Sequence, residues 1–246
     1  MRLDKYLADA GMGTRTEVKK IISKGRVEVN GVKATDPGMK VENGVDSIKA
    51  DEKELSLSVF EYYMLNKPKG IISASRKNSL KRGEKVPFGE EKYAVDLIRE
   101  SVKTDLFPAG RLDKDTEGLL LITNDGQLSH RLLSPGKHVD KTYYTELSGC
   151  LSKADKQRLE EGTDIGDEKP TKPCTINILS DRSCLITLTE GRYHQIKRMF
   201  ATCGLKVTYL KRITFGPLAL DNSLEPGEYR PLNYEELAKL LSEYES

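Results

Sequence analysis

A short polar segment, residues 110–118, carries three carboxylates within five residues: Asp113, Asp115 and Glu117. It precedes a very apolar run at 118–123, which is typical of a buried strand. Loops held by a rigid strand are frequent sites of catalysis, and an ionised carboxylate there can act as a nucleophile or remove a proton. From the spacing alone, an exposed acidic loop is the better explanation.

Basic residues form a second chemical signal, because they are concentrated in separate stretches. Residues 192–212 hold six Lys or Arg and no Asp or Glu, residues 67–85 hold seven against one, and residues 1–40 hold nine against five. The net charge of the whole chain is only +2. Segregated cations in a nearly neutral chain favour local surfaces that bind a polyanion. Solvated helix faces are the ordinary alternative.

The elements at the N-terminus predict a small module of two helices and a hairpin. Apolar residues recur at helical spacing over 3–10, and Thr14 with Glu17 forms a capping box that begins a second helix. An Asn30-Gly31 turn then joins two short strands within 27–32. Together these elements present cations beside a hairpin.

Beyond residue 59, strands and helices mix without a repeat, which indicates an α+β fold with a mixed, largely antiparallel sheet flanked by helices. A basic loop is expected over 71–89, and a turn over 107–110. The expected strands lie at 60–65, 118–123, 142–147, 175–179 and 184–189, and the expected helices at 128–132, 151–159, 193–203 and after Asn233.

The N-terminal residues resemble the S4 RNA-binding domain. The resemblance rests on Arg2-Leu3-Asp4-Lys5-Tyr6-Leu7, on Thr14-Arg15 and on residues 25–31. It implies an RNA-binding domain over 1–48. Residues 49–58 look like an acidic linker or an edge strand that leads to a second domain over 59–246. The resemblance also implies that six cations face RNA phosphates. The alternative is that they are only soluble surface cations: Arg2, Lys5, Arg15, Lys19, Lys20 and Arg26.

Four ordered motifs in the larger domain resemble those of pseudouridine synthases of the RsuA type. The central motif is Gly110-Arg111-Leu112-Asp113-x-Asp115-Thr116-x-Gly118-Leu119-Leu120, and the others are residues 65–70, Lys141-Thr142-Tyr143 and residues 190–200. The Tyr193-His194 pair and residues 226–232 resemble the small-subunit rRNA enzymes more than the large-subunit ones. The resemblance therefore implies isomerisation of a uridine to pseudouridine in 16S rRNA.

The resemblance also implies catalytic roles for three residues. Asp113 is the essential carboxylate, and Arg192 is the expected ion-pair partner that orients it, with a phosphate contact as the alternative for this arginine. Tyr143 is expected to stack on the flipped uracil, and its hydroxyl to help remove the C5 proton. Tyr144 is expected to point to the opposite face of its strand.

Further residues are expected to bind the substrate or the RNA. Arg111 is expected to fill the space that the flipped base leaves, and Ile196 to close the pocket floor. Lys67 and Lys141 are expected to brace the aspartate loop or to contact phosphate. The phosphate contacts expected on the basic helix are His194, Lys197 and Arg198.

Composition limits the remaining possibilities. The four cysteines form no CxxC pair and there are only three histidines, so neither a metal nor another cofactor is expected. No apolar run reaches the length of a membrane helix, and residues 1–5 are not followed by the apolar core of a signal peptide, which predicts a cytoplasmic protein. A monomer is expected because no pattern suggests a dimer seam. The expected partner is small-subunit rRNA, either naked or partly assembled with protein.

Two other functions stay open at this point. A large-subunit (23S) rRNA pseudouridine synthase is the alternative within the same class. A non-catalytic RNA-binding factor for ribosome assembly is the alternative from another class. The presence of Asp113, Tyr143 and Arg192 argues against the second, because a protein that only binds RNA needs none of them.

Overall fold

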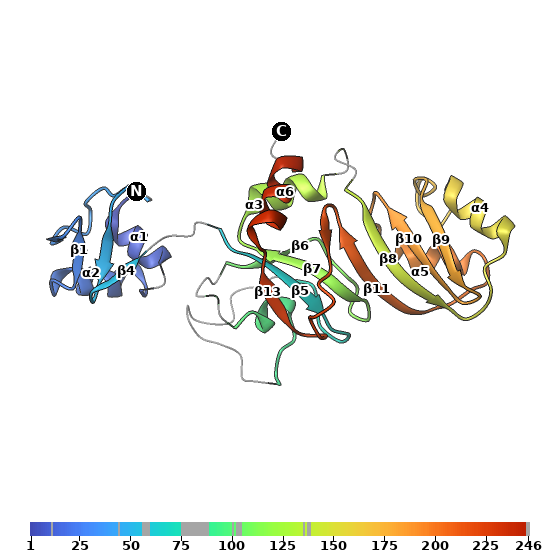
Figure 1. Ribbon diagram of the computed structural model, residues 1–246, viewed down its shortest axis with the longest axis horizontal. Coiled ribbons are helices and arrows are strands. Elements are labelled where there is room, and N and C mark those ends of the chain that lie inside the picture. The colour runs from blue at the N-terminus through green and yellow to red at the C-terminus, as the bar shows by residue number, and fades with distance from the viewer. Residues whose placement is uncertain are drawn as a thin grey trace.

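A computed structural model describes most of the chain (Figure 1). The described residues are 1–55 apart from Gly11 and Gly44, together with 60–74, 89–99, 101, 105–134, 136 and 139–244. The basic loop expected over 71–89 therefore lies largely outside the described residues, from 75 to 88. The N-terminal and larger parts of the chain have separate hydrophobic cores.

The N-terminal domain packs two helices on a four-stranded sheet of order β2-β1-β3-β4. The capping box is confirmed, because the Thr14 amide donates to Glu17 Oε2 at 2.7 Å and the Glu17 amide donates to Thr14 Oγ1 at 3.3 Å. Asn30 and Gly31 both have positive φ, as the hairpin turn requires. The elements are α1 (Leu3–Asp9), α2 (Arg15–Ser23), β1 (Val27–Val29), β2 (Val32–Lys33), β3 (Ile48–Ala50) and β4 (Lys53–Leu55).

The sheet of this domain continues past the expected boundary at residue 48, as far as Leu55. Ile48 and Ala50 alternate with an exposed lysine and fill the inner face of β3, which pairs with β1 along its length. Leu55 packs against the same core. The acidic residues of 51–54 thus lie in a turn and in the edge strand β4.

The larger domain is built on a mixed sheet of order β13-β5-β7-β11-β8-β10-β9, with β12 beside β11 and β6 beside β7. Among the described strands only β7 and β11 pair in parallel, which confirms the expected, largely antiparallel sheet. The strands are β5 (Tyr62–Lys67), β6 (Phe107–Ala109), β7 (Glu117–Thr123), β8 (Lys141–Leu147), β9 (Thr175–Ser180), β10 (Ser183–Leu188), β11 (Val207–Phe215), β12 (Leu218–Ala219) and β13 (Tyr229–Pro231).

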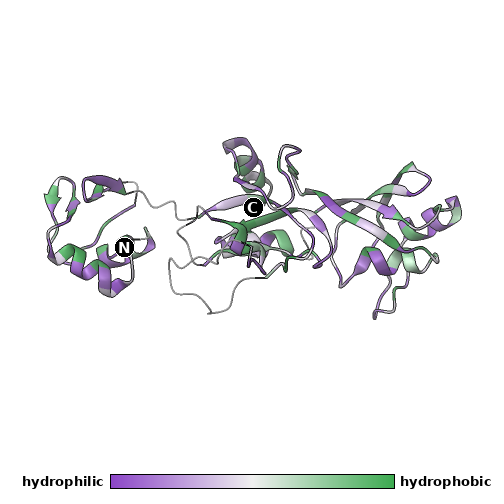
Figure 2. Cartoon of the chain, turned by 90° about the horizontal axis from the view of Figure 1, so that it is seen from below, coloured by the Kyte–Doolittle hydropathy of each residue, from purple (hydrophilic) through white to green (hydrophobic). Residues whose placement is uncertain are grey.

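Helices flank the two ends of this sheet (Figure 1). The helices α3 (Gly126–Leu133) and α6 (Tyr234–Tyr244) pack on each other beside β5 and β7. At the other end, α4 (Lys153–Glu161) lies by β9 and α5 (Gln195–Ala201) lies by β11. Hydrophobic residues are concentrated in the strands at the middle of the domain (Figure 2), and β7 is buried from Gly118 to Thr123. A short 3-10 helix, η1 (Ala94–Leu97), completes the described helices of this domain.

The strand β11 joins the two halves of the sheet, since it pairs with β7 on one side and β8 on the other. The close approach of β7 requires glycine at position 118, where φ is +101° and a Cβ atom would lie 2.2 Å from the Arg212 carbonyl oxygen. The strand places Arg212 directly opposite Tyr143 of β8. Side chains that lie opposite each other in an antiparallel pair share one face of the sheet.

Candidate active site

The loop that carries Asp113 is fixed from below by a buried lysine. Lys67 is fully buried, and its Nζ donates to the carbonyl oxygens of Pro68, Lys114 and Thr116 at 3.0, 3.4 and 2.8 Å. Burial lowers the pKa of Lys67 to about 8. Lys67 therefore braces the aspartate loop through these carbonyl oxygens.

Lys197, in the first turn of α5, and His194, just before that helix, face Asp113. Lys197 Nζ lies 3.1 Å from Asp113 Oδ2 and 2.5 Å from Asp115 Oδ1, and His194 Nε2 lies 3.7 Å from Asp113 Oδ1. Burial lowers the pKa of Lys197, but hydrogen bonds to the two aspartates outweigh it and leave this pKa raised. The hydrogen bond from Lys197 lowers the pKa of Asp115.

The local backbone explains why these two side chains meet the aspartate. His194 adopts the left-handed conformation with φ of 50°, so the chain turns sharply there and the helix begins at Gln195. Residues three apart share a helix face, which places Lys197 one turn along on the side of His194. Lys197 is thus the ion-pair partner of Asp113 rather than a phosphate contact on an open surface.

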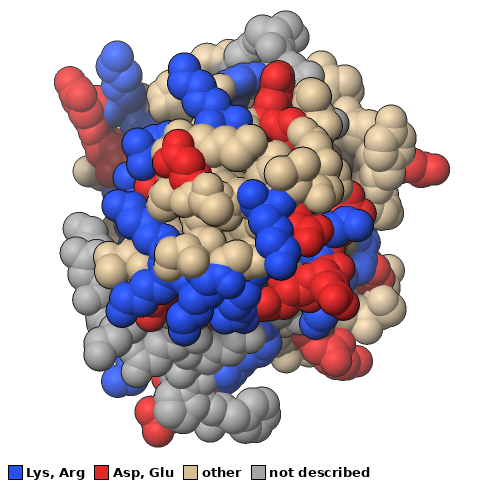
Figure 3. Space-filling view, turned by 90° about the vertical axis from the view of Figure 1, so that its left-hand side faces the viewer, with Lys and Arg blue, Asp and Glu red and all other residues tan. Residues whose placement is uncertain are grey.

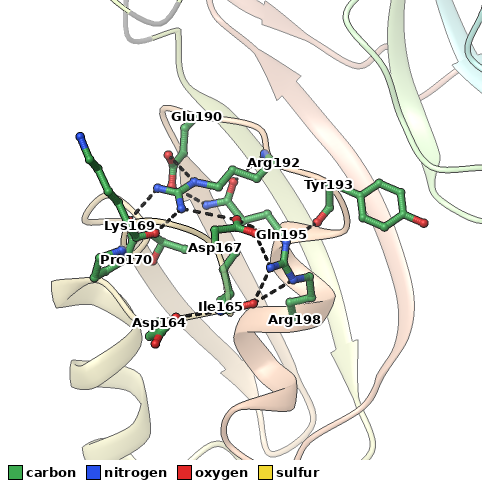
Figure 4. A network of polar contacts seen from close by, with 12 residues as sticks. Asp164, Ile165, Asp167, Lys169, Pro170, Glu190, Arg192, Tyr193, Gln195 and Arg198 are labelled. Carbon is green, nitrogen blue, oxygen red and sulfur yellow. Dashed lines mark hydrogen bonds and ion pairs between the residues drawn. The ribbon is translucent and has the colours of Figure 1, made fainter.

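The expected ion pair between Arg192 and Asp113 is not observed. Arg192 Nε donates to Glu190 Oε2 at 3.1 Å, and its terminal nitrogens donate to the carbonyl oxygens of Lys169 and Pro170 at 2.5 and 2.6 Å. Its terminal nitrogens thus point at the segment before β9 and its Nε points at Glu190 (Figure 4). Arg192 is therefore a structural anchor, and it is also one of the residues that line the pocket.

Arg198 belongs to the same anchor. Its guanidinium donates to the carbonyl oxygens of Ile165 and Tyr193 and pairs with Asp167 (Figure 4). Asp167 also lies 3.5 Å from Arg192. The two arginines thus tie residues 164–170 to the turn that carries His194.

A pocket of about 770 Å³ opens beside Asp113. Its wall includes Tyr143 of β8 and Leu210 of β11, and Ile196 of α5, which is 5% exposed. Ile196 also packs in the core under α5, so the helix-packing and pocket-lining interpretations both hold. Tyr144 packs edge-on against Tyr209, consistent with its expected position on the other face.

Two cations lie among the pocket residues with no carboxylate paired to either within the described part of the chain. Arg212 is 1% exposed; its Nε donates to the Leu119 carbonyl oxygen at 2.8 Å, and its buried Nη2 has no hydrogen-bond partner. Lys141 Nζ donates to the Val139 carbonyl oxygen at 2.7 Å, and burial lowers its pKa to about 8. Both side chains lie over the Phe215 ring.

Sequence reasoning missed Arg212 because it treated residues 192–212 as a surface charge run. The residues of Val207–Phe215 do not mark Arg212 as buried, because its burial comes from β7 and β8 on either side of β11. Arg111, by contrast, is exposed and lines the pocket, where the expectation placed it.

The N-terminal cations form an exposed surface, as the sequence predicts. Many Lys and Arg side chains are visible when the molecule is seen from the side of the N-terminal domain (Figure 3). Two of them are partly neutralised, because Arg2 pairs with Asp4 at 3.0 Å and Arg26 pairs with Asp51. The remaining four are exposed and have no ion-pair partner within the described residues: Lys5, Arg15, Lys19 and Lys20.

The described residues contain no helix long and apolar enough to cross a membrane, and no cluster of three His, Cys, Asp or Glu side chains placed to hold a metal ion. The described site is built from a carboxylate, its lysine partner, aromatic and aliphatic walls, the buried Arg212 and the half-buried Lys141.

Known proteins match the chain over nearly its whole length. The family described as RNA pseudouridylate synthase matches residues 61–202, and the S4 domain matches residues 1–46. An uncharacterized RNA pseudouridine synthase of Bacillus subtilis is 43% identical over 242 residues, covering 96% of this chain and 97% of the relative.

Two further matches extend this similarity. The ribosomal small subunit pseudouridine synthase A of Haemophilus influenzae is 37% identical over 98% of this chain and 100% of its own length. A crystal structure of a pseudouridylate synthase superposes with a TM-score of 0.66 at 37% identity, covering 98% of this chain and 99% of that one. The aspartate loop and its pocket thus lie in a chain that belongs to the RNA pseudouridylate synthase family and begins with an S4 domain.

Proposed function

We propose that this protein isomerises one uridine of small-subunit (16S) rRNA to pseudouridine, with Asp113 as its catalytic carboxylate. The observation that carries the proposal is the Asp113–Lys197 pair, with 3.1 Å between Oδ2 and Nζ, at the edge of a pocket of about 770 Å³. The full-length similarity to proteins named ribosomal small subunit pseudouridine synthase A favours the small-subunit substrate.

The reaction breaks the N1–C1′ bond of uridine and forms a C5–C1′ bond, while C5 loses a proton and N1 gains one. The base must leave its stack to reach Asp113, at a cost of a few kcal/mol that is smallest in single-stranded RNA. Asp113 faces the ribose in this arrangement, because the pocket beyond it has room for the base. Lys197 fixes the orientation of the carboxylate.

The inner wall of the pocket suits the detached uracil. As the N1–C1′ bond breaks, the electron pair stays with the base, whose carbonyl oxygens then share the negative charge. Arg212 carries an unpartnered Nη2 and lies opposite Tyr143, so its guanidinium is available to one of these oxygens. Tyr143 supplies a ring for stacking and a hydroxyl to help remove the C5 proton.

The first prediction tests this function directly. Small-subunit rRNA carrying [5-³H]uridine releases tritium only when C5 is substituted, so we expect release by the wild type and none by Asp113→Asn. The same assay with large-subunit rRNA, and with small-subunit rRNA partly assembled with ribosomal proteins, tests the substrate.

The outcomes separate the alternatives. Release from large-subunit rRNA alone would keep the isomerase and overturn the small-subunit assignment. Undiminished release by Asp113→Asn would remove this residue from the chemistry. Tight, salt-sensitive binding without release from either RNA would favour a non-catalytic binding factor.

A further inference from the structure

An exposed aromatic pair stands at the rim of the active-site pocket. Tyr193 is 77% exposed although it is a large ring, and it lines the pocket together with His194. The two rings are stacked, with centroids 3.9 Å apart and an interplanar angle of 18°. The inner member of the stack, His194, lies 3.7 Å from Asp113. The stack therefore leads from the catalytic carboxylate outward.

The backbone under this pair is held firmly. The Tyr193 carbonyl oxygen accepts a hydrogen bond from Arg198 Nη1 at 3.1 Å, and the Gln195 side chain accepts from the Arg192 amide at 2.9 Å. Arg192 and Arg198 are in turn tied to residues 164–170. Figure 4 shows the Tyr193 ring pointing away from this network. The polar contacts thus fix the turn and leave the outer face of the ring open.

An open, pre-positioned ring beside a flipped nucleotide has an evident use. When a uridine leaves its stack, the bases next to it lose a stacking partner, and this loss is part of the cost of flipping. Stacking of a base on an aromatic side chain is sequence-tolerant, because every base has a flat face. A ring that is already oriented also loses little conformational entropy on binding.

We propose that the outer face of Tyr193 stacks on the unpaired nucleobase next to the target uridine, with His194 as the inner layer of the stack. This inference rests on the proposed function, because it needs an RNA in the pocket. The surroundings favour a nucleic acid over an apolar protein surface, since Arg111, His194 and Lys197 line the same rim. Tyr193 is thereby a binding residue for the neighbouring nucleotide and not a catalytic one.

The test compares variants of Tyr193 with changes in the RNA. The probe is the shortest rRNA fragment that the wild type isomerises, made with an abasic site at the nucleotide on the 5′ or the 3′ side of the target. The variants are Tyr193→Ala, Tyr193→Phe and, as a matched control, Tyr234→Ala, which removes an equally exposed tyrosine, 87% exposed, outside the pocket. Kd, KM and kcat are measured for each pair of protein and RNA.

We expect Tyr193→Ala to raise Kd and KM about 5- to 150-fold, the range for one stacked base, with a much smaller change in kcat. Tyr193→Phe keeps the ring and is expected to stay close to the wild type. One abasic RNA should bind the wild type as weakly as the intact RNA binds Tyr193→Ala. Combining that RNA with Tyr193→Ala should add little, because both changes remove the same contact.

Additive effects of the two changes would overturn the proposal, since independent losses mean that the ring and the base do not touch. An equal loss in Tyr234→Ala would also overturn it. A wrong substrate assignment appears differently: the wild type then isomerises only a large-subunit fragment, and the same comparison is made on that fragment. A wild type inactive on both rRNAs would refute the proposed function and the stacking site together.

Discussion

Lys197 serves two carboxylates at once, and this places it at the centre of the site. Its Nζ bridges Asp113 and Asp115, so its removal leaves two like charges on one short loop without their cation. Like charges in such proximity repel, and the loop has then to rearrange. The geometry of Asp113 relative to the pocket therefore depends on the lysine.

We predict that Lys197→Met lowers kcat about 100-fold, because a displacement of about 1 Å at a reacting group has an effect of this size. The measurement is single-turnover isomerisation together with the RNA Kd, which should change far less. Arg192→Lys is the matched control: it alters a cation of the same basic stretch that contacts Glu190 and two carbonyl oxygens instead of Asp113. A loss of turnover in Arg192→Lys as steep as in Lys197→Met would contradict this assignment.

At the scale of elements, the aspartate loop depends on a lysine buried beneath it. The folded protein holds the pKa of Lys67 at about 8 because of burial, whereas an unfolded chain restores it to about 10.4. Between these pH values the unfolded chain binds more protons than the folded one. The free energy of unfolding contributed by Lys67 therefore rises as the pH increases from about 8 to about 10.4.

This predicts a pH-dependent difference between the wild type and Lys67→Met. From pH 7 to pH 9.5 the wild type should gain about 1–2 kcal/mol in the free energy of unfolding relative to the variant, as the shift implies. Urea unfolding of both proteins at both pH values measures this difference. Groups that both proteins contain, such as the Cys174 thiol, whose pKa burial raises to about 12, cancel when the variant is subtracted from the wild type. A difference that does not change with pH would mean that Lys67 keeps its ordinary pKa.

The elements that the sequence predicted correctly are those whose structure is determined by their own residues. The capping box of Thr14 and Glu17, the Asn30-Gly31 turn and the apolar run of β7 each carry their own physical cause, and each is confirmed. The strand β11 was missed because two adjacent cations, Lys211 and Arg212, interrupt its apolar pattern. The burial of Arg212 is set by β7 and β8 and has no local signal.

The same limit explains the wrong partner for Asp113. A motif gives residue types in order, but the direction of each side chain depends on where α5 begins. That start is set by the left-handed turn at His194, which points Lys197 at the aspartate and leaves Arg192 outside the helix. Asp113, Tyr143 and Arg111 needed no such knowledge, because their loop or strand alone brings them to the pocket.

At the scale of the whole molecule, binding and chemistry are built on separate cores. The core of the S4 domain uses residues between Leu3 and Leu55, and the cores around the pocket use residues between Tyr62 and Leu241. Each domain thus has its own buried apolar residues. This organisation predicts that changes on the S4 surface alter RNA affinity without altering the isomerisation step.

The exposed cations of α2 give this prediction a measurable form. Lys19 and Lys20 are exposed and have no ion-pair partner within the described residues, whereas Arg26 is paired with Asp51. Each lysine that contacts an RNA phosphate releases counterions on binding, so its loss reduces the slope of log Kd against log salt by about 1. We predict that Lys19→Gln with Lys20→Gln weakens rRNA binding, lowers this slope by about 1–2 and leaves single-turnover isomerisation at saturating RNA unchanged.

Arg26→Gln is the control and should have a smaller effect, because Asp51 already neutralises that guanidinium. An unchanged salt slope in the double variant would remove α2 from the RNA interface, and a loss of the isomerisation rate at saturation would show that the S4 domain also shapes the active site.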